Sequence, residues 1–151
     1  MLRRTELRRT QRLRRAAIMH RHTYTGPSVR TRRVVRARAQ DGCEWPLCGR
    51  VGTDYHHRLN RKQGGRHGHR RVEVNRPSWI VLVCRLHHDA VTSASGPALV
   101  HARQTGWVLT EDQCASSVPI ETVHGRCWLA DDGTVSRQDP DGGYRDAGET
   151  T

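Results

Sequence analysis

Cysteine and histidine residues recur along the segment 43–88 at spacings that suit a metal site. Cys43 and Cys48 lie upstream, and Cys84, His87 and His88 lie downstream. Three cysteines and one histidine complete a tetrahedral zinc site of the structural type, and four residues between the first two cysteines is a usual spacing. Because His87 stands at Cys-x2-His spacing, it is the natural fourth ligand. We therefore predict structural Zn²⁺ at Cys43, Cys48, Cys84 and His87.

Histidines are left over for a second site. His56 and His57 are adjacent and lie between the two groups of zinc ligands. Neighbouring residues on a helix point about 100° apart, so His88 is expected to turn from the zinc and face this pair. Two histidines can hold a divalent ion and a third can take a proton from water, the minimum for metal-assisted phosphodiester hydrolysis. A second structural zinc and a non-catalytic DNA-binding finger are the alternatives.

Short elements must bring these residues together, and the fold class expected is α+β. The apolar patterns predict a helix over 28–40 stopped by Gly42, then strands over 51–55 and 79–83 separated by a polar loop, and a helix over 85–93. Further along they predict a helix over 97–104, a strand over 107–109 and a β-hairpin over 118–130. The hairpin is expected to pack on the core or to serve as a docking surface.

Composition favours a small, metal-stabilised protein that binds nucleic acid. The chain has 151 residues, no Phe and a hydrophobic fraction of 34%, so its core is thin and a structural metal would supply needed stability. The net charge is +11, almost all of it from Arg, and thirteen Arg fall within residues 1–39. Such an excess of Arg indicates a phosphate-bearing partner, and DNA is the partner expected. From Asp131 onward the sequence is acidic and Gly-rich and is expected to be mostly disordered.

The cysteines also bear on the compartment. No apolar signal segment and no membrane-spanning run are found, so the thiols are expected to stay reduced in the cytoplasm, with no membrane partner. Cys114 and Cys127 have no partners at ligand spacing. Both are expected to be ordinary buried thiols.

Taken in order, these motifs resemble the HNH endonucleases and their ββα-metal fold, most closely the small HNH proteins of actinobacterial phages. The resemblance rests on Cys-x4-Cys-Gly, Tyr-His-His-Arg, Gln-Gly-Gly and Leu-Val-Cys-x2-His-His, and covers roughly residues 28–110. It implies a zinc-stapled nuclease domain over 28–110. Composition and apolar pattern then give the rest of the chain: a basic, flexible arm over 1–27, a β-hairpin extension over 111–137 and a disordered acidic tail over 138–151. The resemblance further implies DNA cleavage, in phage DNA processing or packaging, with a terminase as a possible partner.

The resemblance also implies a role for each matched residue. His56 and His88 would bind the catalytic divalent ion, and His57 would be the general base. Mg²⁺ is the ion expected, and imidazole ligands also suit Mn²⁺ or Ni²⁺. The family's middle Asn is replaced here by Trp79, so Asn75 is expected to fill its role by restraining the backbone of His57. The alternative is that Asn75 caps a turn.

Two further expectations follow from the same region. At the position of a further family histidine the chain has Thr92, which would leave the catalytic ion two protein ligands, completed by water and phosphate. Basic residues after the general base are expected to contact phosphates, although they could equally be surface charge. They are Arg58, Arg61, Lys62 and Arg66. The competing function is a non-catalytic, zinc-stabilised DNA-binding or packaging accessory protein.

Overall fold

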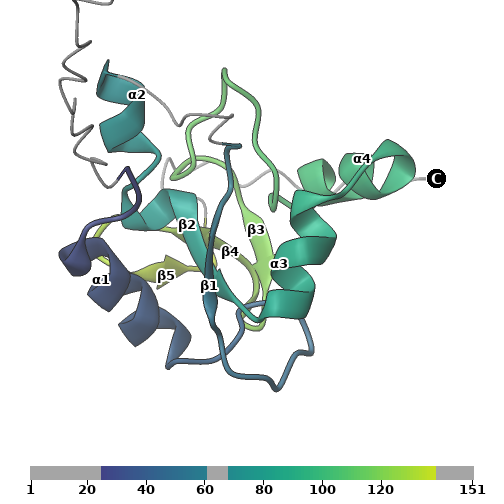
Figure 1. Ribbon diagram of the computed structural model, residues 1–151, viewed down its shortest axis with the longest axis horizontal. Coiled ribbons are helices and arrows are strands. Elements are labelled where there is room, and N and C mark those ends of the chain that lie inside the picture. Colours follow the sequence, from purple (N-terminus) through teal and green to yellow (C-terminus); the bar gives the residue numbers. More distant parts are fainter. Residues whose placement is uncertain (1–24, 61–67, 139–151) are drawn as a thin grey trace, which may run out of the picture.

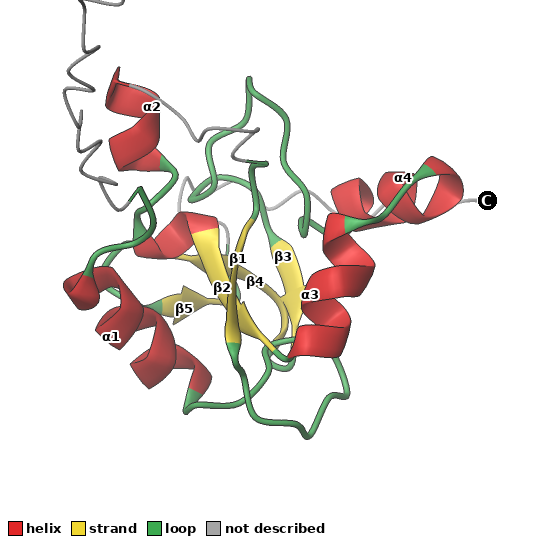
Figure 2. Ribbon diagram, in the orientation of Figure 1, coloured by secondary structure: helices red, strands yellow, loops and turns green. Residues whose placement is uncertain are grey.

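The structure is a computed structural model, and it describes residues 25–60 and 68–138. Within these ranges the chain has a mixed α+β architecture with two small antiparallel sheets (Figures 1 and 2). The helices are α1 (Val29–Ala39), α2 (Gly68–Glu73), α3 (Arg85–Thr92) and α4 (Gly96–Gln104), with a 3-10 turn at Pro77–Trp79. The strands are β1 (Asp54–His57), β2 (Ile80–Val83), β3 (Ile120–Thr122), β4 (Gly125–Leu129) and β5 (Val135–Ser136). Most of the predicted basic arm and most of the predicted acidic tail lie outside the described residues.

The first sheet carries the histidines and leads directly into a helix. Strands β1 and β2 pair antiparallel, with His57 opposite Ile80 and Asp54 opposite Val83. Every residue of β2 is buried, which fits its continuous apolar sequence. Cys84 directly follows this strand and is the N-cap residue of α3. Helix α3 contacts β1 while α1 contacts β2, and Figure 2 shows the two helices on either side of this strand pair.

The second sheet confirms the predicted hairpin and extends it. Strands β3 and β4 pair antiparallel with Ile120 opposite Cys127, and β5 pairs with β4 through Val135 and Ser136. The hairpin packs on the core, because Ile120, Cys127 and Leu129 are all fully buried. The presence of β5 shows that the expected disorder does not begin at Asp131, while residues 139–151 lie outside the described residues.

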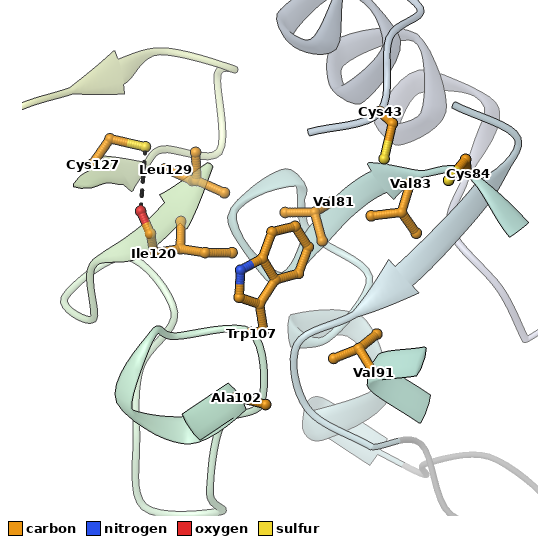
Figure 3. Close-up of a cluster of buried hydrophobic side chains, with 10 residues drawn as sticks. All are labelled: Cys43, Val81, Val83, Cys84, Val91, Ala102, Trp107, Ile120, Cys127 and Leu129. Carbon is orange, nitrogen blue, oxygen red and sulfur yellow. Dashed lines mark hydrogen bonds between the residues drawn. The ribbon is translucent and has the colours of Figure 1, made fainter. Parts of the chain in front are cut away.

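Tryptophan takes the place of the missing phenylalanine in the core. Trp107 is 1% exposed and belongs to a cluster that joins the two sheets. In Figure 3 its indole lies between Ile120 of β3 and Val81 of β2. Trp79 is 2% exposed and belongs to a second cluster under α1, where Val35 is fully buried. The two large indoles thus fill space that a chain this poor in apolar residues could not otherwise fill.

The predicted helices of the core form, with local adjustments. The side chain of Ser28 caps α1 by accepting from the amide of Thr31, at 3.0 Å. Helix α1 ends before the predicted stop at Gly42, since Gln40 and Asp41 both adopt positive φ. Helix α3 covers nearly the whole predicted range, and α4 begins at Gly96.

Three predicted segments differ from the structure. Strand β1 begins three residues later than predicted and contains the paired histidines rather than ending before them. Residues 68–71, the end of the predicted polar loop, belong to α2. Residues 107–109 do not form a strand. The amides of Trp107 and Val108 both donate to the carbonyl of Ala102, at 2.8 and 3.0 Å, and so close the end of α4.

Candidate metal centre and adjoining histidine cleft

Four side chains converge at the point where β2 meets α3. The ligand atoms of Cys43, Cys48, Cys84 and His87 all lie within 4.8 Å of one another. His87 Nδ1 lies 3.5 Å from Cys43 Sγ and 3.3 Å from Cys84 Sγ. Zn–S and Zn–N bonds of about 2.3 and 2.0 Å give tetrahedral edges of about 3.5–3.8 Å, so the observed distances fit a zinc ion. This Cys3His cluster could therefore bind a metal such as zinc.

Local backbone contacts place the two upstream cysteines. An antiparallel bridge pairs Gly42 with Val51, and the amide of Cys43 donates to the carbonyl of Arg50, at 2.8 Å. This closes a loop in which the amide of Cys48 donates to the carbonyl of Trp45, at 3.1 Å. The loop is joined to the first sheet, because the amide of Glu44 donates to the carbonyl of Leu82, at 2.8 Å. Both upstream thiols are thereby brought to Cys84 at the end of the same strand.

The charge balance of the cluster calls for a cation. Burial raises the pKa of the Cys43 thiol to about 11, so a thiolate there is unfavourable without a positive partner. Burial also acts to raise the pKa of Cys84, but the backbone N–H of His87 and the neighbouring thiols outweigh it and the pKa is lowered. Burial and the charge of Arg50 lower the pKa of His87, which keeps its imidazole neutral and able to bind a metal. A divalent ion would stabilise the buried thiolates.

A cleft of about 880 Å³ lies beside this cluster, along β1 and α3. All three of the remaining predicted histidines line it: His56, His57 and His88. Its other walls come from α4 and from the segment that follows Trp107. The polar residues that line the cleft as a whole include Asp54, Asn60, Thr92, Arg103, Thr110 and Glu111.

His56 is a buried, neutral imidazole with a defined tautomer. It is 6% exposed, and burial lowers its pKa to about 4. Its Nε2 lies 3.0 Å from the carbonyl oxygen of Trp107. Since a carbonyl can only accept, Nε2 carries the proton and Nδ1 carries the lone pair. A metal ion or a proton would therefore bind to His56 at Nδ1.

His57 is held by Asn75 through its ring. The Asn75 amide nitrogen donates to the carbonyls of Thr25 and Arg71, at 3.1 and 2.8 Å, so the amide oxygen must face the histidine. That oxygen lies 2.9 Å from His57 Nε2 and accepts its proton. The lone pair of the neutral ring is then on Nδ1. Asn75 thus restrains the imidazole of His57, whereas the sequence led us to expect a restraint on the backbone.

His88 contributes a nitrogen that lacks a protein partner. Its ring lies 5.9 Å from that of His56, edge to face. Its Nδ1 is buried and makes no hydrogen bond within the described part of the chain; the nearest charged atom is Asp89 Oδ1, at 3.6 Å. An orphaned imidazole nitrogen beside a second imidazole fits a divalent ion, because neutral histidines are common ligands of such ions. The adjacent residues therefore belong to different sites: His87 to the Cys3His cluster and His88 to the cleft.

Asp54 adds an ionised carboxylate at the rim of the cleft. Its pKa is lowered by the hydrogen bond from Thr53 Oγ1, at 2.7 Å, and further by His88 and Arg85. Arg85 Nη1 donates to Asp54 Oδ1, at 3.2 Å. The carboxylate therefore brings negative charge near His88, which favours a cation there.

The prediction that Arg58 contacts nucleic acid is wrong. Its side chain is fully buried, and its guanidinium donates to backbone carbonyls of several segments. The acceptors are Gly106, Ser78, Ala115, Val118 and Pro119, at 2.8–3.5 Å. Burial and the nearby charge of Arg38 lower its pKa to about 9, so it still carries its charge at neutral pH. Arg58 ties the chain after α4 to the strands of the first sheet.

The other predicted residues have mixed outcomes. Arg61, Lys62 and Arg66 lie outside the described residues. Cys127 is buried as predicted, whereas Cys114 is exposed, since it lies in the turns that precede β3.

Trp79 and Thr92 stand where the sequence departs from the family pattern, and both are described by the structure. Trp79 is a core residue and does not itself line the cleft. Thr92, on α3, lines the cleft.

Sequence reasoning missed the polar core beside the cluster. Arg38 and Glu44 form a buried bidentate ion pair, with distances of 2.8 and 2.9 Å. Glu44 Oε2 also accepts from the amide of Leu82, at 2.7 Å. The charge pattern of the sequence does not predict this ion pair, because nothing distinguishes Arg38 from the other arginines of the same basic segment. The position of Glu44, directly after a metal-binding cysteine, was the one available clue.

Comparison with known proteins adds no relative. No family model matches the sequence, and neither a curated protein nor a solved structure matches it. The resemblance to HNH endonucleases therefore rests on the sequence motifs. Within residues 25–60 and 68–138, no helix is long and apolar enough to span a lipid bilayer.

Proposed function

We propose that this protein is a metal-dependent endonuclease of the HNH type, with a ββα-metal core formed by β1, β2 and α3. The observation that carries the proposal is the shared cleft. His56 and His88 lie side by side in it, and His57, whose ring is oriented by Asn75, lines the same cleft. Paired ligands beside an oriented base are what hydrolysis of a phosphodiester needs. The adjacent Cys3His cluster fits the structural zinc of such a core.

In this proposal each histidine has one task. His57 takes a proton from the attacking water at Nδ1, because its Nε2–H donates a hydrogen bond to Asn75 Oδ1. His56 and His88 would hold a divalent ion, which when bound supplies Lewis-acid stabilisation of the phosphate and of the leaving oxygen. Mg²⁺ is the proposed physiological ion, and the imidazole donors also suit Mn²⁺ or Ni²⁺. Asn75 is proposed to act through His57 rather than on the phosphate.

DNA is the proposed substrate because the cleft and its surroundings present positive charge. Arg103 on α4 lines the cleft and is exposed. Arg30 and Arg33 are exposed on α1, and Pro27, two residues before this helix, lines the cleft. Exposed guanidinium groups near a hydrolytic site would hold the phosphates of the substrate backbone. A role in phage DNA processing or packaging, with a terminase as partner, is proposed on the sequence resemblance.

Nicking of supercoiled plasmid tests the proposal. We expect the full chain, loaded with zinc, to nick plasmid with Mg²⁺ or Mn²⁺, and H57A to lose about 10²–10⁴-fold in rate. H101A is the matched control, because His101 is exposed on α4 and does not line the cleft. Cleavage by H57A at the normal rate would remove His57 as the base. DNA binding without cleavage under every divalent ion would support the non-catalytic accessory protein instead.

A further inference from the structure

The hydrogen bond from His56 to Trp107 joins the cleft to a rigid turn. The acceptor is the main-chain carbonyl of Trp107, 3.0 Å from His56 Nε2. A ligand histidine is oriented by the bond that its other ring nitrogen makes, and this bond also fixes its tautomer. The position of this one carbonyl therefore decides whether Nδ1 of His56 carries the lone pair.

The turn that carries this carbonyl is fixed on several sides. Gly106 has a φ of +76°, and a Cβ placed there would lie 2.0 Å from the carbonyl oxygen of Pro119. The amide of Trp107 donates to Ala102, and its indole Nε1 donates to the carbonyl of Glu121, at 2.9 Å. The side chain of Trp107 is 1% exposed. The amide of Val108, in the same peptide unit as the carbonyl, also donates to Ala102, so the backbone and the indole of Trp107 are held in one turn.

The indole of Trp107 is in turn supported from the metal cluster. Its ring centroid lies 4.5 Å from that of Trp45, at an angle of 40°. Trp45 stacks on His87, with centroids 4.8 Å apart and planes within 10°. His87 belongs to the Cys3His cluster. A continuous series of ring contacts therefore runs from the cluster through Trp45 and Trp107 to His56.

We propose that Trp107 is a positioning residue that links the two metal sites: its carbonyl fixes the tautomer of His56, and its indole is held by Trp45 against the ligand His87. The inference deepens the proposed function, on which the divalent ion in the cleft rests. It assigns the Cys3His cluster a second task besides stabilising the fold, which is to support a ligand of the catalytic ion. Loss of the indole of Trp45 should leave the cluster in place but free the carbonyl of Trp107.

The test reads the tautomer of His56 directly by ¹⁵N–¹H NMR of the imidazole nitrogens in the full, zinc-loaded chain. We expect the Nε2–H tautomer in the natural sequence and a mixture of tautomers in W45L. W45F keeps an aromatic ring on His87 and should restore the natural tautomer. W128F is the matched control, because Trp128 lies on β4 and has none of these ring contacts. Zinc content, measured for each variant, shows that the cluster is intact.

Binding of Mn²⁺ supplies the second readout. Changes to partners of a metal ligand typically cost 10–100-fold in affinity, so W45L should weaken binding of Mn²⁺ in the cleft by about this factor. A natural His56 with its proton on Nδ1, or a W45L variant with unchanged tautomer and Mn²⁺ affinity, would overturn the inference. A chain that shows the expected tautomers and Mn²⁺ binding but never cleaves DNA would instead overturn the endonuclease proposal. The two failures are therefore distinguishable.

Discussion

Neutralising Glu44 should destabilise this protein far more than neutralising an exposed acid beside it. Glu44 is fully buried and accepts from Arg38 Nε and Nη2 and from the amide of Leu82. In E44Q one carboxylate oxygen becomes an amide NH₂. The remaining oxygen can still accept from Leu82 and from Arg38 Nη2, but the new NH₂ meets the Nε–H of Arg38, and two donors then face each other.

The larger cost comes from the charge left behind. The Arg38 side chain is 1% exposed, so E44Q leaves a guanidinium in the protein interior without a counter-charge. Its other acceptors are the carbonyls of Pro77 and Ile80, at 3.0 and 2.6 Å, and these are neutral. Removing one partner of a buried ion pair typically costs about 3–5 kcal/mol, a large part of the free energy of unfolding of a small domain.

The matched control is D41N. Asp41 pairs with Arg36 at 2.7 Å, but the two side chains are 66% and 49% exposed, so water screens the pair and its loss should change stability little. Asn also tolerates the positive φ of position 41. With an m-value of about 2 kcal/mol/M, urea unfolding of the zinc-loaded chain should shift its midpoint by about 2 M for E44Q.

Equal midpoints for E44Q and D41N would refute this reasoning. If E44Q fails to fold, the double variant R38M/E44L decides the matter, because it removes both charges and replaces them with apolar side chains of similar volume. Such replacements are often neutral or stabilising. A double variant that is no more stable than E44Q would show that the loss does not come from the unpaired charge.

Three further outcomes are expected. N75A should lower the rate of plasmid nicking at least tenfold while the affinity for DNA stays the same, because Asn75 orients the ring of His57 and is not proposed to contact the phosphate; an equal loss of affinity would contradict this role. R58M should lower the free energy of urea unfolding by more than about 4 kcal/mol, since several buried carbonyls lose their donor. R58K should lower it less, because lysine keeps some of these hydrogen bonds. Chelation of zinc should unfold the core, as followed by circular dichroism, and Zn²⁺ but not Mg²⁺ should restore it; an unchanged spectrum would show that the metal is not structural.

Ligand spacing and apolar runs carried most of what the sequence could predict. The Cys-x4-Cys and Cys-x2-His halves of the cluster, the buried strand β2 and the helix α3 follow from short-range patterns, because each is set by residues within one element or one turn. The hairpin of β3 and β4 was predictable for the same reason. Segment 107–109 was predicted as a strand from its apolar residues, but the amides of Trp107 and Val108 cap α4, a contact that the local pattern does not encode.

The arginines show most clearly where sequence reasoning ends. Arg58 and Arg38 are buried and bind carbonyls and a carboxylate, while Arg30 and Arg33 are exposed. All four stand in strongly basic surroundings, so charge alone cannot separate them. What separates them is the number of backbone carbonyls that the tertiary fold leaves unpaired. A guanidinium has five N–H donors, and a buried arginine is the residue that can satisfy many carbonyls at once.

Two pairs of adjacent histidines explain how one short segment can serve two sites. Successive residues of a strand point to opposite faces, so His56 turns toward Trp107 and His57 turns toward Asn75. Successive residues of a helix point about 100° apart, so His87 reaches the cysteines while His88 reaches the ring of His56. Because Cys84 directly follows β2 and is the N-cap residue of α3, the angle between strand and helix is set at a residue of the cluster itself. The metal that the cluster could bind would therefore fix the relative placement of His56 and His88, the two side chains on which a divalent ion in the cleft would depend.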